Sequence, residues 1–183
     1  MRYVALLRGI NVGGKHPIRM TALKTCFEAQ GLREVTTYIQ SGNVVFTATA
    51  RAAEIAGRLE AALVATFDCR TSVMLRSHKE MQAIVTRAPK GFGAQPAKYR
   101  YDVIFLNPPL TADAAIVQVL TRPGVDQARA GSGVLYFSRL ISKASQSQLA
   151  RVVSLPIYKS MTIRNWRTTT TLLRMMTADA PVS

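Results

Sequence analysis

Two hydrophobic periods alternate along the chain and predict a repeating order of strands and helices. Runs of apolar, β-branched and aromatic residues are typical of strands, whereas apolar residues spaced three and four apart indicate one buried helix face. The first half is predicted to form a strand, a helix, two strands joined by a tight turn, a helix and a strand, over residues 3–7, 20–30, 35–39, 43–47, 52–67 and 71–76. Ser77 and Glu80 then have the spacing of a capping box at the start of a further short helix.

The same order returns after a Gly- and Pro-rich segment at residues 90–98. Strands and helices are predicted there over residues 101–106, 112–120, 127–130, 134–138, 145–153, 161–163 and 166–176. Each half therefore has the order β-α-β-β-α-β followed by a helix, although no letter-by-letter repeat relates the halves. We predict an α+β protein with two tandem ferredoxin-like (α/β-plait) halves, 1–88 and 98–183, joined by a linker at 89–97. Each half is expected to be an antiparallel sheet backed by two helices.

A glycine-rich loop follows the first predicted strand and is the main candidate site. Its polar and glycine residues include Arg8, Asn11, Gly13, Gly14 and Lys15. Glycine tolerates positive φ and lets backbone amides face a ligand, so a loop with two cationic side chains suits an anion. In the ferredoxin-like order the first and second strands run parallel with the third between them. We therefore expect Arg8 and Asn43 to lie in one concave rim.

The loop fits most of the P-loop pattern, but two departures exclude a nucleotide-hydrolysing site. His16 follows Lys15 where a Mg²⁺-binding Ser or Thr is required. The helical pattern begins only near Met20, whereas in a P-loop the helix N-terminus meets the phosphates directly. The dinucleotide fingerprint G-x-G-x-x-G is absent as well.

The chain carries 24 Lys and Arg against 10 Asp and Glu, a formal charge of +14, and places these charges unevenly. Residues 1–27 and 127–178 contain several basic residues and no acidic residue. A positive field of this kind attracts polyanions or phosphorylated molecules. Codon usage in a GC-rich genome, which enriches Ala and Arg, is the compositional alternative.

Composition excludes several other classes of protein. Cys26 and Cys69 are too few for a disulfide framework, and with His16 and His78 they give no metal-ligand spacing, so neither a metal nor a cofactor is expected. Paired catalytic carboxylates, a Ser-His-Asp order and G-x-S-x-G are absent. No apolar run approaches the ~20 residues that span a membrane. The strand that follows Met1 leaves no signal-peptide pattern, which predicts a cytoplasmic protein.

Three segments resemble a known family. The opening LLRGINVGG, the hairpin TYIQSGNVVF and the closing TIRNW are similar to the signature of an uncharacterised bacterial family, domain of unknown function 1697. The resemblance covers nearly the whole chain and implies two α/β-plait halves with no assigned activity. Arg167 and Thr171 depart from the closing pattern of the family, in which Asn and Lys are usual, whereas Arg164, Asn165, Trp166 and Thr168 match it.

Several of the matching residues also have ordinary structural explanations. Asn165 suits the N-cap of the last helix, Trp166 suits a core or inter-domain plug, and Ser41 and Asn43 are typical hairpin residues. Arg164, like Arg8, ends a strand beside a turn-forming residue. RNA-binding domains of the RRM type share the ferredoxin-like order, but the third strand at 43–47 supplies a single Phe and lacks their aromatic pattern.

We expect a basic, non-catalytic, polyanion-binding protein with nucleic acid as the polyanion. Two alternatives stay open: an enzyme acting on a phosphorylated small molecule held at the glycine loop, and a structural or assembly module. The expected ligand-binding residues are Arg8, Asn11, Gly13, Gly14, Lys15, Ser41, Asn43, Lys143, Arg164 and Asn165. No catalytic residue, cofactor, metal, membrane contact or oligomeric state is assigned.

Overall fold

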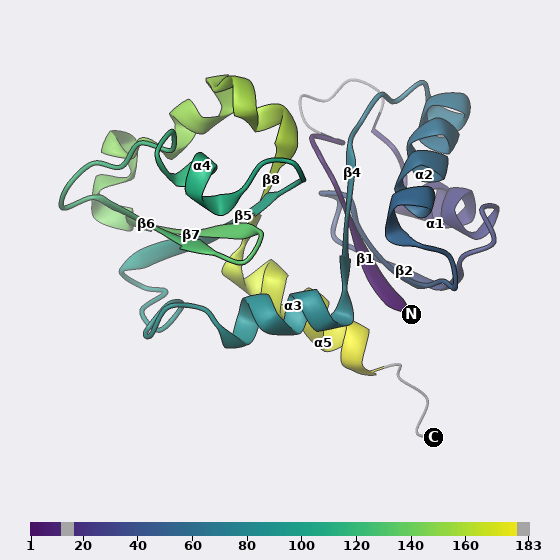
Figure 1. Cartoon of the computed structure of the whole chain (residues 1–183), viewed down its shortest axis with the longest axis horizontal. Helices are drawn as coiled ribbons and strands as arrows, with labels where there is room; N and C mark the ends of the chain where they lie inside the picture. The colour runs from purple at the N-terminus through teal and green to yellow at the C-terminus, as the bar shows by residue number, and fades with distance from the viewer. Residues whose placement is uncertain (12–16, 179–183) are drawn as a thin grey trace. The chain divides into compact units, whose positions relative to one another are not determined.

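A computed structural model describes residues 1–11 and 17–178. The protein has a mixed α+β fold with two four-stranded antiparallel sheets (Figure 1). Two compact units contain them: unit 1 comprises residues 1–81 and the chain from Thr171, and unit 2 comprises Gln82–Thr170. The predicted boundaries differ from this division mainly in the last helix, which they assign wholly to the second half.

Unit 1 contains a sheet in the order β2-β3-β1-β4. Its strands are β1 (Arg2–Leu7), β2 (Arg33–Tyr38), β3 (Asn43–Thr47) and β4 (Val73–Ser77), and all hydrogen-bonded neighbours are antiparallel. Because β3 lies between β1 and β2, those two strands run in the same direction, as predicted. The central strand β1 is almost wholly apolar, which suits a strand with a partner on each side.

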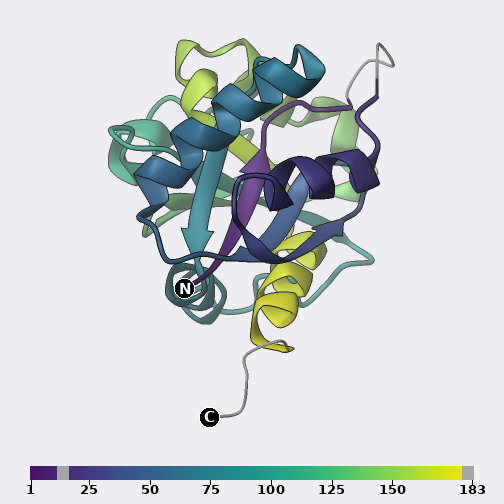
Figure 2. The ribbon, with the colours of Figure 1, turned by 90° about the vertical axis from the view of Figure 1, so that its right-hand side faces the viewer.

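One face of this sheet is covered by α1 (Met20–Glu28) and α2 (Ala52–Phe67) (Figure 2). Leu23 and Phe27 of α1 and Ile55, Leu59 and Leu63 of α2 are fully buried in one cluster. These positions recur at helical spacing, which is why the sequence predicts both helices within two residues of their observed ends. The α2 helix ends at Asp68, whose φ of 49° is in the left-handed region.

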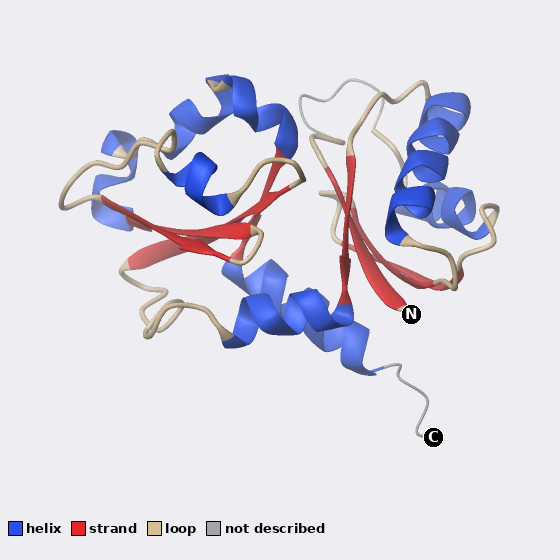
Figure 3. Ribbon diagram, viewed as in Figure 1, coloured by secondary structure: helices blue, strands red, loops and turns tan. Residues whose placement is uncertain are grey.

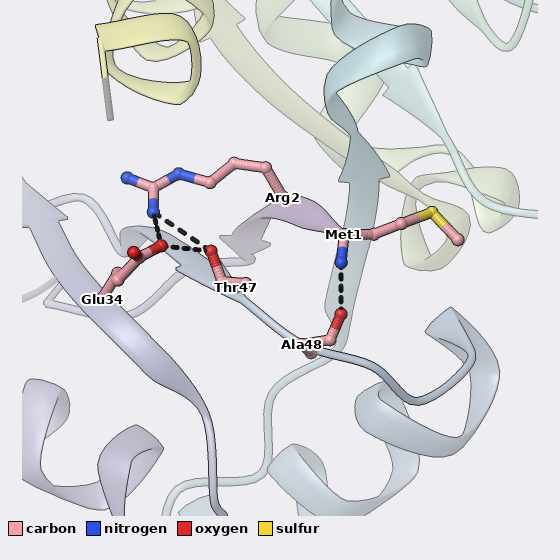
Figure 4. Close-up of polar contacts among 5 residues, drawn as sticks. All are labelled: Met1, Arg2, Glu34, Thr47 and Ala48. Atoms are coloured by element: carbon pink, nitrogen blue, oxygen red, sulfur yellow. Dashed lines mark hydrogen bonds and ion pairs between the residues drawn. The ribbon is translucent and has the colours of Figure 1, made fainter. Parts of the chain in front are cut away.

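A polar cluster at one end of β1 links three strands of unit 1 (Figure 4). Arg2 Nη1 donates to Glu34 Oε2 at 2.7 Å and to Thr47 Oγ1 at 3.2 Å, while Thr47 Oγ1 donates to the same carboxylate oxygen at 2.5 Å. The Thr47 hydrogen bond and the Arg2 charge lower the pKa of Glu34. The Met1 ammonium donates to Ala48 O at 2.6 Å.

Unit 2 contains the second sheet, in the order β6-β7-β5-β8. Its strands are β5 (Tyr99–Leu106), β6 (Asp126–Gly131), β7 (Val134–Leu140) and β8 (Met161–Asn165). Ile104, Leu106, Leu135 and Phe137 lie on one face with buried residues of α4 (Ala112–Ile116). Because strand residues alternate between faces, Tyr101, Val103, Tyr136 and Ser138 lie on the other.

The helix predicted at 145–153 is absent from unit 2, and the helix predicted at 112–120 is shorter than expected. Three 3₁₀ segments replace the first: η1 (Ile141–Gln146), η2 (Leu149–Ser154) and η3 (Pro156–Ser160) (Figure 3). Asp126 Oδ2 accepts from Gln148 N at 2.8 Å, and Ser147 Oγ accepts from Leu149 N at 3.2 Å. Because one of these acceptors, Asp126, lies 22 residues away in sequence, hydrogen bonds made by the fold as well as local ones override the apolar period here.

Two helices begin directly after the last strands of the two sheets. In α3 (His78–Thr86), Ser77 N donates to Glu80 Oε2 at 2.7 Å and Glu80 N donates to Ser77 Oγ at 3.3 Å, which confirms the predicted capping box. In α5 (Trp166–Ala178), Thr168 N donates to Asn165 Oδ1 at 2.7 Å, which confirms the predicted N-cap. The caps explain why both helices start where the sequence indicates.

Candidate functional site

The glycine loop is represented in the structure by its two ends. Gly13, Gly14 and Lys15 lie outside the described residues, so their expected ligand contacts stay predictions. Asn11, at φ 58°, accepts from Ile18 N at 2.7 Å and donates from Nδ2 to Ile18 O and Gln40 O, both at 3.0 Å. Its amide therefore closes the base of the loop and ties it to the β2–β3 hairpin.

Arg8 and Asn43 lie at the same end of the first sheet, as the predicted topology requires. Asn43 pairs with Leu6, and Leu7 N donates to Gly42 O at 2.8 Å. Asn43 is fully buried, however, and its Nδ2 donates to Tyr38 O at 3.0 Å and to Ser41 Oγ at 2.9 Å. The Asn43 side chain thus shapes the hairpin and is turned away from solvent, while the ligand role expected for Ser41 stays a prediction.

Gly42 explains why this hairpin lies so close to the loop. Its φ is 73°, and an added Cβ would stand 2.7 Å from Ile10 Cδ1 and 2.9 Å from Leu7 Cβ. Only glycine fits both the backbone angle and the contact.

The residues expected from the second half are spread over unit 2. Arg164 is 8 % exposed on β8, and its Nη1 donates to Thr162 Oγ1 at 3.0 Å and to Ile163 O at 2.9 Å. Burial lowers the pKa of Arg164 to about 10, so the guanidinium is still charged at neutral pH. Asn165 caps α5, and the exposed Lys143 belongs to η1. A ligand role for these three residues stays a prediction.

A cavity of ≈ 290 Å³ in unit 2 was not anticipated from the sequence. It opens beside the face of the second sheet that carries tyrosines and is bordered by the turns at 89–95. We call it the tyrosine cavity; it is lined by Pro89, Lys90, Gly91, Phe92, Gln95, Tyr99, Tyr101, Gln127, Arg129, Tyr136 and Ser138. None of these lining residues is acidic, and Lys90 and Arg129 are basic and exposed.

Strand register accounts for the grouping of the lining side chains. Ser138 of β7 pairs with Tyr101 of β5 on one side and with Gln127 of β6 on the other. Tyr136, two residues earlier on the same face, pairs with Arg129. Residues far apart in the chain thus form two adjacent rows across three strands.

An edge-to-face aromatic cluster forms one wall of the cavity. The Phe92 ring lies 4.9 Å from that of Tyr101, 5.3 Å from that of Tyr136 and 5.1 Å from that of Trp166, measured between centroids. Tyr136 is 3 % exposed and donates from its hydroxyl to Ile84 O at 2.6 Å, and burial raises the pKa of its phenol. Trp166 is half-buried against Phe92, as expected for a packing residue.

The segment predicted as a linker is a series of hydrogen-bonded turns that pack on the second sheet. Phe92 N donates to Pro89 O, Ala94 N to Gly91 O, and Gln95 N to the Tyr101 hydroxyl at 3.3 Å. These contacts hold Phe92 and Gln95 at fixed positions on the sheet. The cavity wall is therefore preformed.

One signal in the sequence could have revealed the tyrosine cavity. Tyr99 and Tyr101 alternate with Arg100 and Asp102, which places both rings on one sheet face. The Gly and Pro residues between 89 and 96 are typical of a linker, and a linker gives no reason to expect Phe92 to pack against the sheet. Only the strand register shows that Tyr136 lies on the same sheet face as the rings of Tyr99 and Tyr101.

The groups available for metal binding and the character of the helices bear on the class of site. Across residues 1–11 and 17–178, no group of three or more His, Cys, Asp and Glu side chains could hold a metal ion. In the same part of the chain, no helix combines the length and apolar character needed to cross a membrane.

Comparison with known proteins gives a family and similar solved structures. The profile of a family described as protein of unknown function, DUF1697, matches residues 1–136. The solved structure of conserved bacterial protein SP0830 from Streptococcus pneumoniae is 28% identical, with a TM-score of 0.83 over 96% of this chain and 98% of that one. No curated protein matches the chain. The chain therefore belongs to the DUF1697 family.

Proposed function

We propose that this is a cytoplasmic, non-catalytic protein that binds single-stranded nucleic acid through its phosphates. The observation that carries the proposal is the pair of exposed cations, Lys90 and Arg129, at a tyrosine-lined cavity whose lining has no acidic residue. Arg129 can hold a phosphate through two parallel hydrogen bonds, and Lys90 adds a point charge. Lys98 is also exposed just before β5, and because its Nζ lies over the Tyr99 ring it extends the basic surface at the cavity.

The overall charge supports the same partner. With 24 basic and 10 acidic side chains, one-to-one pairing would leave an excess of 14 cations, and none of the residues that line the cavity is acidic. Binding to phosphates releases condensed counterions, so affinity falls steeply as salt rises.

We also propose that the two sheets arose from one duplicated ferredoxin-like unit. Supporting this, β1 and β5 hold equivalent central positions, and the orders β2-β3-β1-β4 and β6-β7-β5-β8 correspond strand by strand. Arg76 pairs with Val4 and Arg164 pairs with Val103, and both arginines are buried one residue before a helix cap. The correspondence includes the residue types as well as the topology.

A salt titration tests the functional proposal. Fluorescence anisotropy with labelled single-stranded RNA, single-stranded DNA and duplex DNA would be measured from ~50 to ~500 mM NaCl. We expect micromolar or tighter binding of single strands at low salt, with log affinity linear in log salt. The variant Lys90→Gln/Arg129→Gln should reduce the slope by about 0.7 for each phosphate that the protein no longer neutralises.

The matched control is Arg58→Gln/Arg151→Gln, which removes the same charge from exposed positions on α2 and η2. It should leave the slope closer to that of the native protein. Absence of binding at ~50 mM salt, where phosphate attraction is strong, would refute the proposal. A small phosphorylated compound that stabilises the protein without any oligonucleotide binding would instead favour the enzyme alternative.

A further inference from the structure

The tyrosine cavity has features that phosphate attraction alone does not require. Two half-buried rings, those of Tyr99 and Tyr101, lie on one face of β5 with centroids 6.0 Å apart and planes tilted by 46°. Lys98 Nζ lies over the Tyr99 ring, 5.4 Å from its centroid. A half-exposed ring with a neighbouring cation offers a flat, electron-rich surface to a planar ligand.

The two other aromatic rings of the lining are committed to packing. Tyr136 is held by its hydrogen bond to Ile84 O, and Phe92 is enclosed by Tyr101, Tyr136 and Trp166. They form a rigid support that fixes the orientation of Tyr101. A planar ligand that stacks on Tyr99 and meets Tyr101 with its edge therefore needs no rearrangement of the wall.

Neutral hydrogen-bonding side chains complete the lining. Gln95, Gln127 and Ser138 each offer a donor and an acceptor, which matches the mixed edge of a nucleobase better than the uniform acceptors of a phosphate. Lys90 and Arg129 lie in the same lining and suit the phosphate. The cavity thus combines aromatic rings, neutral hydrogen-bonding groups (two glutamine amides and a serine hydroxyl) and two cations.

We propose that the tyrosine cavity binds one unstacked nucleobase, which stacks on the Tyr99 ring with its edge toward the Tyr101 ring, while Arg129 and Lys90 hold its adjacent phosphate. This inference deepens the proposed function and rests on it for the identity of the polyanion. At ≈ 290 Å³ the cavity lies at the lower end of small-molecule sites, which suits one base. A duplex cannot present such a base, because its bases are paired and stacked.

An oligonucleotide without bases separates stacking from phosphate attraction. Affinities for a labelled single strand and for an abasic strand of equal length and charge would be measured at one salt concentration. The native protein should bind the base-containing strand on the order of tenfold more tightly. Tyr99→Leu should abolish this preference and leave the salt slope unchanged, whereas Arg129→Gln should lower the slope.

Matched controls separate a loss of stacking from a loss of folding. Tyr99→Phe keeps the ring and should keep the preference, and Tyr38→Leu makes the same substitution at a half-buried tyrosine of unit 1. Circular dichroism and thermal melting of each variant show whether it is folded. If Tyr99→Leu is unfolded, Gln127→Ala, at an exposed position of β6, takes its place and should weaken the preference.

Titration with mononucleotides distinguishes a free nucleotide from a base within a strand. If the native protein binds both strands equally, the stacking inference is wrong while the polyanion proposal stands. If neither strand binds but a mononucleotide does, and Tyr99→Leu abolishes that binding, the cavity inference stands and the polyanion proposal fails. If nothing binds, both are wrong.

Discussion

Asp102 is a buried acidic residue whose surroundings only partly compensate the loss of water around its carboxylate. It is 8 % exposed on the central strand β5, and its Oδ2 has no hydrogen-bond donor among the described residues. Arg139 Nη2 lies 3.8 Å from that oxygen, beyond hydrogen-bonding distance. Desolvation raises the pKa of Asp102, and the opposing charges of Arg139 and Arg100 offset this only in part.

We predict that Asp102→Asn changes how stability depends on pH. A carboxyl whose pKa is raised on folding binds more protons in the folded than in the unfolded state, so native stability falls as pH rises between the two pKa values. Asn cannot ionise, so the variant should lose this decline and gain stability relative to the native protein from acidic to neutral pH. Urea unfolding of both proteins at several pH values measures the free energy of unfolding as a function of pH. If the free energies of unfolding of the two proteins differ by the same amount at every pH in that range, the prediction is wrong.

Gly93 shows how one position fixes the wall of the tyrosine cavity. Its φ is 85°, and an added Cβ would lie 2.3 Å from Trp166 Nε1. Gly91 has a similar φ of 80° but has open space beside it. The two glycines therefore separate backbone strain from steric contact.

We predict that Gly93→Ala destabilises the protein more than Gly91→Ala does. Gly91→Ala should cost about 1 kcal/mol from the left-handed backbone alone. Gly93→Ala adds displacement of Trp166 and Phe92, for a total of about 2–4 kcal/mol. Chemical denaturation measures both costs, and near-UV circular dichroism should change only for Gly93→Ala. Equal costs would mean that the Trp166 contact is easily relieved.

At the scale of elements, each sheet passes from its last strand into a helix through one polar cap. Ser77 caps α3 and Asn165 caps α5, so that each turn of chain direction is stabilised by a side chain next to the strand end. The turns at 87–98 follow no apolar period, and the 3₁₀ segments at 141–160 do not follow the helical period of residues 145–153. Both depend on hydrogen bonds to residues elsewhere in unit 2.

We predict that Asn165→Ala lowers the free energy of unfolding by about 1 kcal/mol, because Thr168 N loses its acceptor. Asn165→Ser retains a capping oxygen and should cost a few tenths of that amount. Urea denaturation of the two variants measures the difference. An Ala variant as stable as the Ser variant would show that water replaces the cap at no cost.

At the scale of the whole molecule, the dominant physical property is the formal charge of +14. Like charges repel one another more strongly in the compact state than in the expanded unfolded state. The ion pairs between described residues include a partly exposed one between Arg2 and Glu34, and such pairs contribute little. Repulsion is therefore largely unrelieved when salt is low.

We predict that the melting temperature rises with NaCl between ~20 and ~300 mM, because ions screen the repulsion over a Debye length of about 10 Å. Arg58→Glu/Arg151→Glu, which lowers the formal charge from +14 to +10, should show a smaller rise. Differential scanning fluorimetry measures both. A melting temperature that does not change with salt would show that repulsion contributes little to stability.

The sequence alone determined the elements whose side chains have a regular period. The helix at 52–67, the two hairpins, the capping box at Ser77 and Glu80 and the N-cap at Asn165 follow from local rules, because period, turn residues and cap chemistry act over four residues or fewer. The order of these elements, read as ferredoxin-like, also placed the Asn43 hairpin at the same end of the sheet as Arg8. It also identified the family signature.

Only the tertiary structure decided which polar residues are buried and which residues share a site. Arg164 and Asn43 are both buried, and their burial depends on neighbours that are distant in sequence. Local spacing could not bring Phe92, Tyr101, Gln127 and Tyr136 together, because their grouping requires the register of three strands and the folding of the 87–98 turns onto them. Sequence patterns record a local period, whereas a cavity is made by non-local pairing.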